Sequence, residues 1–76
     1  MAGTAEAHIA VRVNGEPAVY PVGATVLDVA RACGLRDDER GVAIARCGEV
    51  VPRGRWADAA VQEGDTLEVV RAAAGG

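Results

Sequence analysis

The sequence predicts a small α+β domain in which a single helix packs across one face of a β-sheet. Residues 9–20 alternate apolar and polar side chains on either side of Asn14-Gly15, which is typical of a hairpin. Residues 26–33 carry apolar side chains at helical spacing, and shorter apolar runs at 42–45, 49–51 and 67–70 predict further strands. Because the strands do not alternate with helices, a doubly wound parallel sheet is excluded.

The first two strands form a hairpin whose register follows from its turn. Asn14-Gly15 predicts a two-residue type I′ turn, which requires positive φ at both positions. Residue 13 then faces 16, 11 faces 18 and 9 faces 20, so Tyr20 shares a face with the apolar residues of the first strand. Pro17 and Pro21 lack the amide hydrogen that a sheet ladder needs, so we expect the second strand at a sheet edge.

The helix is expected between a capping box and a glycine. Thr25 and Asp28 resemble the capping pair, and Gly34 provides a left-handed stop. The helical spacing places Cys33 on the buried face, together with Val26, Val29 and Ala30. A charged, solvated loop follows at 36–40.

The second half of the chain predicts a hairpin and a central last strand. Strands at 42–45 and 49–51 flank a Cys47-Gly48 turn, whereas 53–63 is too short for a definite element. Trp56 is expected as a lid over the core, and Arg53 as a donor to backbone carbonyls. After a turn at Gly64-Asp65, residues 67–70 are apolar on both faces, which favours the middle of the sheet.

Composition limits both size and function. The chain has 76 residues, its hydrophobic content is largely alanine, and eight arginines with no lysine stand against 11 acids, for a net charge of −3. We therefore expect one small core over residues 9–71, a disordered leader at 1–8 and a flexible tail at 72–76. Without a basic patch or aromatic platform, nucleic-acid binding is disfavoured. The apolar runs are too short to span a membrane, and no signal peptide is recognisable, so we expect a cytoplasmic protein.

The reactive side chains do not assemble a catalytic or metal centre. His8 lies at the start of the first strand, and a surface histidine is its simplest interpretation. Cys33 is expected as a small core residue, and Cys47 as an exposed turn residue without an activating neighbour. Two cysteines and one histidine neither complete a zinc site nor supply the four ligands of an iron–sulfur cluster.

The most informative segment is the last one. Beyond Arg71 the chain continues through three alanines to Gly75-Gly76. An ordinary terminus remains one interpretation. The alternative is a thin arm, about 17 Å long when extended, that threads a channel in a partner and presents the Gly76 carboxylate.

Several segments resemble the ThiS-type sulfur carriers of thiamine biosynthesis. They are Val13-Asn14-Gly15-Glu16, Thr25-Val26, Gly48-Glu49-Val50-Val51-Pro52-Arg53 with Trp56, Gly64-Asp65 and Gly75-Gly76, so the resemblance runs over residues 9–76. It implies a β-grasp (ubiquitin-like) fold, a mixed sheet of four to five strands with one main helix across one face.

The resemblance also implies a carrier rather than an enzyme. An adenylyltransferase related to ubiquitin-activating enzymes would use ATP to adenylate Gly76, while Gly75 and Ala74 thread its channel. A persulfide would supply sulfur, and the resulting thiocarboxylate would serve a thiazole synthase; the carrier itself would bind no cofactor and no metal. From the strand pattern we expect partners to dock on the sheet face opposite the helix, at Val70, Ala43 and Ala45.

Other functions stay open at this point. The same tail suits a sulfur carrier for molybdopterin, cysteine or a sulfur-containing secondary metabolite, and it suits a ubiquitin-like protein modifier. An interaction domain with an inert tail is a further alternative.

Overall fold

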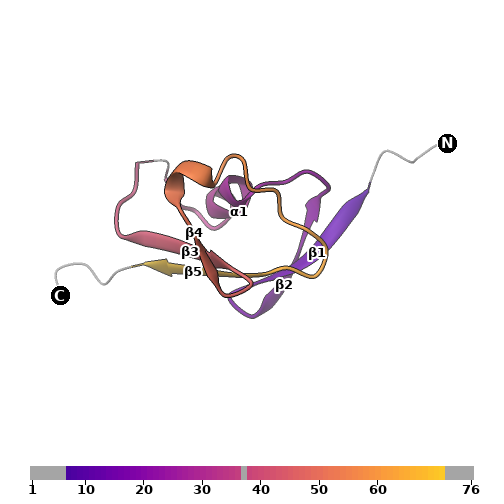
Figure 1. The fold of residues 1–76 in the computed structure, drawn as a ribbon. Helices are drawn as coiled ribbons and strands as arrows, with labels where there is room; N and C mark the ends of the chain where they lie inside the picture. The colour runs from indigo at the N-terminus through magenta and orange to yellow at the C-terminus, as the bar shows by residue number, and fades with distance from the viewer. Residues whose placement is uncertain (1–6, 37, 72–76) are drawn as a thin grey trace.

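The computed structural model describes residues 7–36 and 38–71 (Figure 1). The elements follow the predicted order, with one short 3₁₀ helix added between the fourth and fifth strands. They are β1 (His8–Val13), β2 (Glu16–Pro21), α1 (Val26–Ala32), β3 (Val42–Arg46), β4 (Glu49–Val51), the 3₁₀ helix η1 (Arg53–Arg55) and β5 (Thr66–Arg71). β1 begins one residue earlier than expected. The calls on residues 1–6 and 72–76 lie outside the described residues.

The strands form one mixed sheet in the order β2-β1-β5-β3-β4. β5 pairs in parallel with β1 and antiparallel with β3, which confirms the prediction that the last strand is central. The parallel pairing joins only Arg12 with Thr66 and Val13 with Leu67, so β5 then runs on past the end of β1 (Figure 1). The start of β1 and the end of β5 therefore lie at opposite ends of the sheet.

The first hairpin has the predicted register. Val13 faces Glu16, Val11 faces Ala18 and Ile9 faces Tyr20. Asn14 and Gly15 both adopt positive φ, 52° and 84°. The Asn14 side chain also accepts a hydrogen bond from the Val69 amide at 2.8 Å, so the turn is tied to the central strand.

Helix α1 begins at the predicted capping box. The Thr25 hydroxyl accepts from the Asp28 amide at 3.2 Å, and the Asp28 carboxylate accepts from the Thr25 amide at 2.9 Å. Val26, Val29 and Ala30 are fully buried against the sheet. The face they cover carries Val11, Ile44 and Leu67, and the described core is completed by Ala24, Leu35, Trp56 and Val61.

The placement of Cys33 on the buried face was wrong. The helix ends at Ala32, and Cys33 becomes an exposed C-cap with φ −84° and ψ 4°. Gly34 then reverses the chain at φ 85°, which turns Leu35 into the core at 6% exposure. A helical spacing extended one residue too far therefore assigned to Cys33 the position that Leu35 fills.

Candidate functional site

The candidate functional region suggested by the sequence is the end of β5, after which the predicted reactive tail follows in the sequence. Gly76, Gly75 and Ala74 lie outside the described residues, whereas Arg71, the last residue of β5, is described. Its guanidinium lies 3.3 Å from a Glu39 carboxylate oxygen, and the other oxygen of that carboxylate accepts from the Arg36 amide at 3.2 Å. The loop before β3 is thereby bonded to the root of the tail.

The predicted docking residues lie together on the sheet face that α1 leaves uncovered. Val70 is directly opposite Ala43, and Ala45 is opposite both Glu68 and Val50. Val70 and Val50 are 57% and 69% exposed. We call Ala43, Ala45, Val50 and Val70 the open face. Sequence reasoning omitted Val50, although the hairpin register that pairs it with Ala45 follows from the two-residue Cys47-Gly48 turn.

Trp56 and Arg53 stabilise β4 and the loop before β3. Trp56 is 3% exposed, and its indole Nε1 donates to the Val51 carbonyl at 2.9 Å, in agreement with the predicted lid. The Arg53 guanidinium lies 4.6 Å from the centre of the indole ring. It also donates to the carbonyls of Glu39 and Arg36, as predicted, so η1 is fastened to the loop that meets Arg71.

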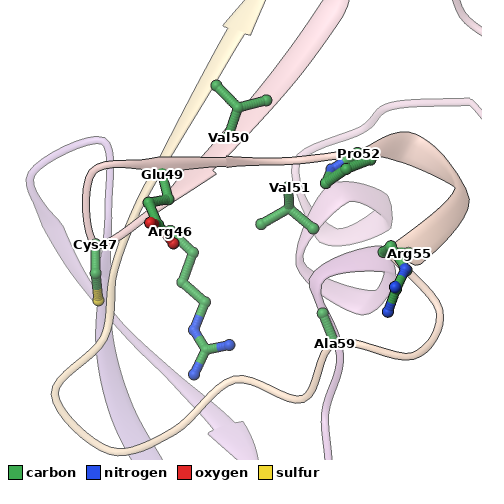
Figure 2. A pocket seen from close by; sticks show the side chains of 8 residues that line it. All are labelled: Arg46, Cys47, Glu49, Val50, Val51, Pro52, Arg55 and Ala59. Carbon is green, nitrogen blue, oxygen red and sulfur yellow. The ribbon is translucent and has the colours of Figure 1, made fainter.

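A cavity of about 470 Å³ lies between β4 and η1 (Figure 2). Its lining residues are Arg46, Cys47, Glu49, Val50, Val51, Pro52, Arg55 and Ala59. Arg46 extends into the cavity in Figure 2, but its Nε is bonded to Asp65 at 2.8 Å. The lining contains one thiol, that of Cys47, and no histidine or lysine that could serve as its base.

Asp65 is a buried acid that the sequence indicated only as a turn residue. Its carboxylate accepts from Arg46 Nε and from the Gln62 amide, each at 2.8 Å, and from the Cys47 thiol at 3.5 Å. The network joins the β3–β4 turn to the loop before β5. Asp65 therefore stabilises the position of the turn relative to the loop.

One family model matches the chain, over residues 11–76, and it is that of the ThiS family. The chain belongs to the ThiS family. The match includes the open face, the Val51-Pro52-Arg53 segment with Trp56, and the terminal Gly75-Gly76.

A solved ThiS structure has the same fold. It is the thiamine biosynthesis protein (ThiS) from Geobacter metallireducens, which is 24% identical and superposes with a TM-score of 0.72. The alignment covers 90% of this chain and 100% of that one. This likeness confirms the β-grasp fold. No curated protein sequence matches the chain.

The remaining reactive groups of this ThiS family member are scattered over the fold. Cys47 is exposed in its turn, as predicted, at φ 51°. Burial raises the pKa of the Tyr20 phenol, and the nearby Cys33 thiol adds to that rise. Within residues 7–36 and 38–71, no group of three or more histidine, cysteine or acidic side chains is placed to hold a metal ion. No helix of the described chain is long and apolar enough to cross a membrane.

Proposed function

We propose that this protein is a sulfur carrier of thiamine biosynthesis whose working group is the carboxylate of Gly76. The observation that carries the proposal is the family match, which extends through Gly75-Gly76. The fold supports it, because β5, the central strand, ends at one end of the sheet immediately before the tail in the sequence. The protein acts as a substrate of other enzymes in the cytoplasm.

The chemistry proceeds on the tail in three steps. The Gly76 carboxylate attacks the α-phosphate of ATP in a ubiquitin-activating-like adenylyltransferase, and pyrophosphate leaves. The outer sulfur of a persulfide then displaces AMP from the acyl carbon. The product is an acyl disulfide, in which the new bond joins sulfur to the acyl carbon and the S–S bond is the one the persulfide brought. A thiol attacks the donor-side sulfur and cleaves that S–S bond, which leaves a disulfide and the C-terminal thiocarboxylate, and a thiazole synthase takes up the thiocarboxylate sulfur. The carrier needs no bound cofactor, since ATP is supplied to the activating partner.

Ala74 and Gly75 thread through a channel of the partner, and this explains why the segment before Gly76 consists of alanine and glycine only. Glycine has no Cβ, so the last residues pass a channel that larger side chains would block. The bond between Arg71 and Glu39 holds the root from which this segment starts.

Intact mass spectrometry of the protein purified from its own organism tests the proposal. A carrier shows a fraction of molecules in which one oxygen is replaced by sulfur, and this fraction disappears when the adenylyltransferase gene is deleted. A ladder of isopeptide-linked products would instead identify a protein modifier. An unchanged mass in both strains would identify an inert tail.

The acceptor is tested separately. Deleting the carrier should make growth depend on added thiazole or thiamine. Growth rescued only by cysteine, or a deficiency in molybdopterin, would assign the carrier to one of those acceptors and would contradict the thiazole destination.

The open face is the proposed docking surface for the adenylyltransferase. An exposed apolar patch loses contact with water when a partner covers it, and a charge at its centre prevents that burial. We expect Val70→Arg to reduce ATP–pyrophosphate exchange with the cognate adenylyltransferase by about tenfold or more, which corresponds to about 1.4 kcal/mol. Val19→Arg, another exposed valine but on the β2 edge strand, is the matched control. Exchange by Val70→Arg at the wild-type rate would contradict the placement.

A further inference from the structure

A single strand carboxylate borders the open face. Glu68 lies on β5 directly opposite Ala45, and Val70 follows two residues later on the same side of the sheet. The other acids of the described strands are Glu16, which faces the partly buried Val13, and Glu49, which precedes the outward-facing Val50. Because side chains alternate along a strand, both lie on the side that α1 covers. Glu68 is therefore the one strand carboxylate on the uncovered side of the described sheet.

The Glu68 carboxylate is unpaired within the part of the chain that the structure describes. It is exposed, and it takes part in no ion pair or side-chain hydrogen bond there. Arg12, on the neighbouring strand β1, donates instead to the Gly15 carbonyl at 3.1 Å. By contrast, Asp38 and Glu39 each form an ion pair with an arginine of this chain. Solvent alone therefore stabilises the charge of Glu68.

This charge restricts what can cover the open face. A partner that covered Ala45 and Val70 with apolar side chains alone would remove water from the neighbouring carboxylate and give it no partner, which is costly. A lysine or arginine of the partner would instead donate a charge-assisted hydrogen bond to it. A carboxylate at that place would be repelled, so the pair also discriminates between partners.

We propose that the open face docks a partner surface in which a lysine or arginine lies beside an apolar patch, and that Glu68 binds this cation. The inference rests on the proposed function and deepens it, because the adenylyltransferase is the partner assigned to this face. The apolar contacts of Val50 and Val70 contribute affinity, and the Glu68 pair selects among activating enzymes.

Isothermal titration calorimetry of the full-length protein with its cognate adenylyltransferase, without ATP, tests the pairing. We expect Glu68→Gln, which keeps the shape and removes the charge, to weaken binding about fivefold or more at low salt. The affinity of the wild-type protein should fall as NaCl is raised from about 0.05 M to about 0.5 M, and that of Glu68→Gln should fall less steeply. Glu68→Arg should weaken binding further, because two cations would then face each other.

The matched control is Glu16→Gln, which removes the same charge from an exposed strand residue on the other side of the sheet and should leave the affinity unchanged. The melting temperature of Glu68→Gln should equal that of wild type, because the carboxylate has no partner in the described chain to lose. A change in affinity without a change in stability separates docking from folding.

Equal affinity and equal salt dependence of wild type and Glu68→Gln would overturn the proposal, even where Val70→Arg still prevented docking. Self-association of the wild-type protein that Glu68→Gln removes would identify a second copy of the chain as the occupant and would also overturn it. Binding without ATP–pyrophosphate exchange would contradict the carrier function alone. Normal exchange with no effect of Glu68→Gln on binding would contradict this inference alone.

Discussion

Asp65 is the only buried acidic side chain among the described residues, and it is 8% exposed. It accepts hydrogen bonds from Arg46 at the end of β3, from Cys47 in the β3–β4 turn and from Gln62 in the loop before β5. Buried carboxylates persist where their partners compensate for the lost water, and here Arg46 and the Gln62 amide do so. The residue therefore contributes to stability through one local bond, to Gln62, and through contacts with Arg46 and Cys47 that are remote in the sequence.

We expect Asp65→Ala to lower the free energy of unfolding by about 2–3 kcal/mol, because it leaves the Gln62 amide and the Arg46 guanidinium without their acceptor. Urea unfolding followed by circular dichroism measures the change. Asp38→Ala, which removes an exposed acid, should stay within about 0.5 kcal/mol of wild type. Equal values for the two variants would show that the Asp65 network carries no net stability.

Among the elements, helix α1 depends on tertiary packing for its stability, because a helix of seven residues is not stable alone in water. Its capping box and its buried Val26, Val29 and Ala30 therefore act together. The helix exists because it covers the sheet.

Because α1 depends on its buried face, we expect Val26→Asp to unfold the domain. Val26 is fully buried, and a carboxylate there costs about 4 kcal/mol or more, most of what a small domain has. Ala32→Asp, on the exposed end of the same helix, is the control. Thermal unfolding of Val26→Asp near the wild-type temperature would contradict the assignment of this face to the core.

The two prolines of the edge strand β2 protect that edge without weakening the hairpin. In an antiparallel hairpin, hydrogen-bonded and non-hydrogen-bonded residue pairs alternate along the strands. The Val22 amide donates to the Ala7 carbonyl, which shows that Val22 belongs to a hydrogen-bonded pair and its neighbour Pro21 to a non-hydrogen-bonded pair. Pro17 and Pro21 both fall at positions whose nitrogen faces away from β1. They cost the sheet no internal bond, and they remove donors that a foreign strand would use.

We expect the double variant Pro17→Thr, Pro21→Thr to stay folded but to self-associate. Threonine restores two outward amide donors on an exposed strand of good β-propensity. Sedimentation velocity over a range of concentrations measures the association, and wild type run in parallel gives the baseline. A variant that remains monomeric at every concentration would show that the prolines do not protect this edge.

At the scale of the whole molecule, fold and function should separate at the tail. Deleting Gly75 and Gly76 removes no side chain and lies beyond β5, so the melting temperature should not change. ATP–pyrophosphate exchange should be lost, because the carboxylate moves by about 7 Å and the reaction depends on its position.

Gly76→Ala is the finer variant, since it keeps the length and adds one Cβ beside the reacting carbon. We expect slower exchange with unchanged binding to the adenylyltransferase. Wild-type exchange by the truncated protein would show that Gly76 is not the reacting end.

Much of this architecture could be predicted from the sequence, because local chemistry specifies it. The Asn14-Gly15 turn determines a register, and the Thr25 capping box determines where α1 begins. The Asp65 network has another origin, whereas the Cys33 error came from extending a local helical spacing by one residue. The network depends on which distant segments meet in the fold, and no local pattern in a single sequence encodes that meeting.

Trp56 is the only tryptophan of the chain, and it is nearly inaccessible to water. Its fluorescence therefore reports on one place, where the indole touches Arg53 and the Val51 carbonyl. Emission moves to longer wavelength when an indole meets water, so unfolding is visible without any added dye. Because the ring lies in the core on the helix side of the sheet and away from the open face, the same signal distinguishes unfolding from docking on the open face in a cuvette. The molecule thus carries its own optical probe of an intact core, which stays unchanged when chemistry takes place on the tail.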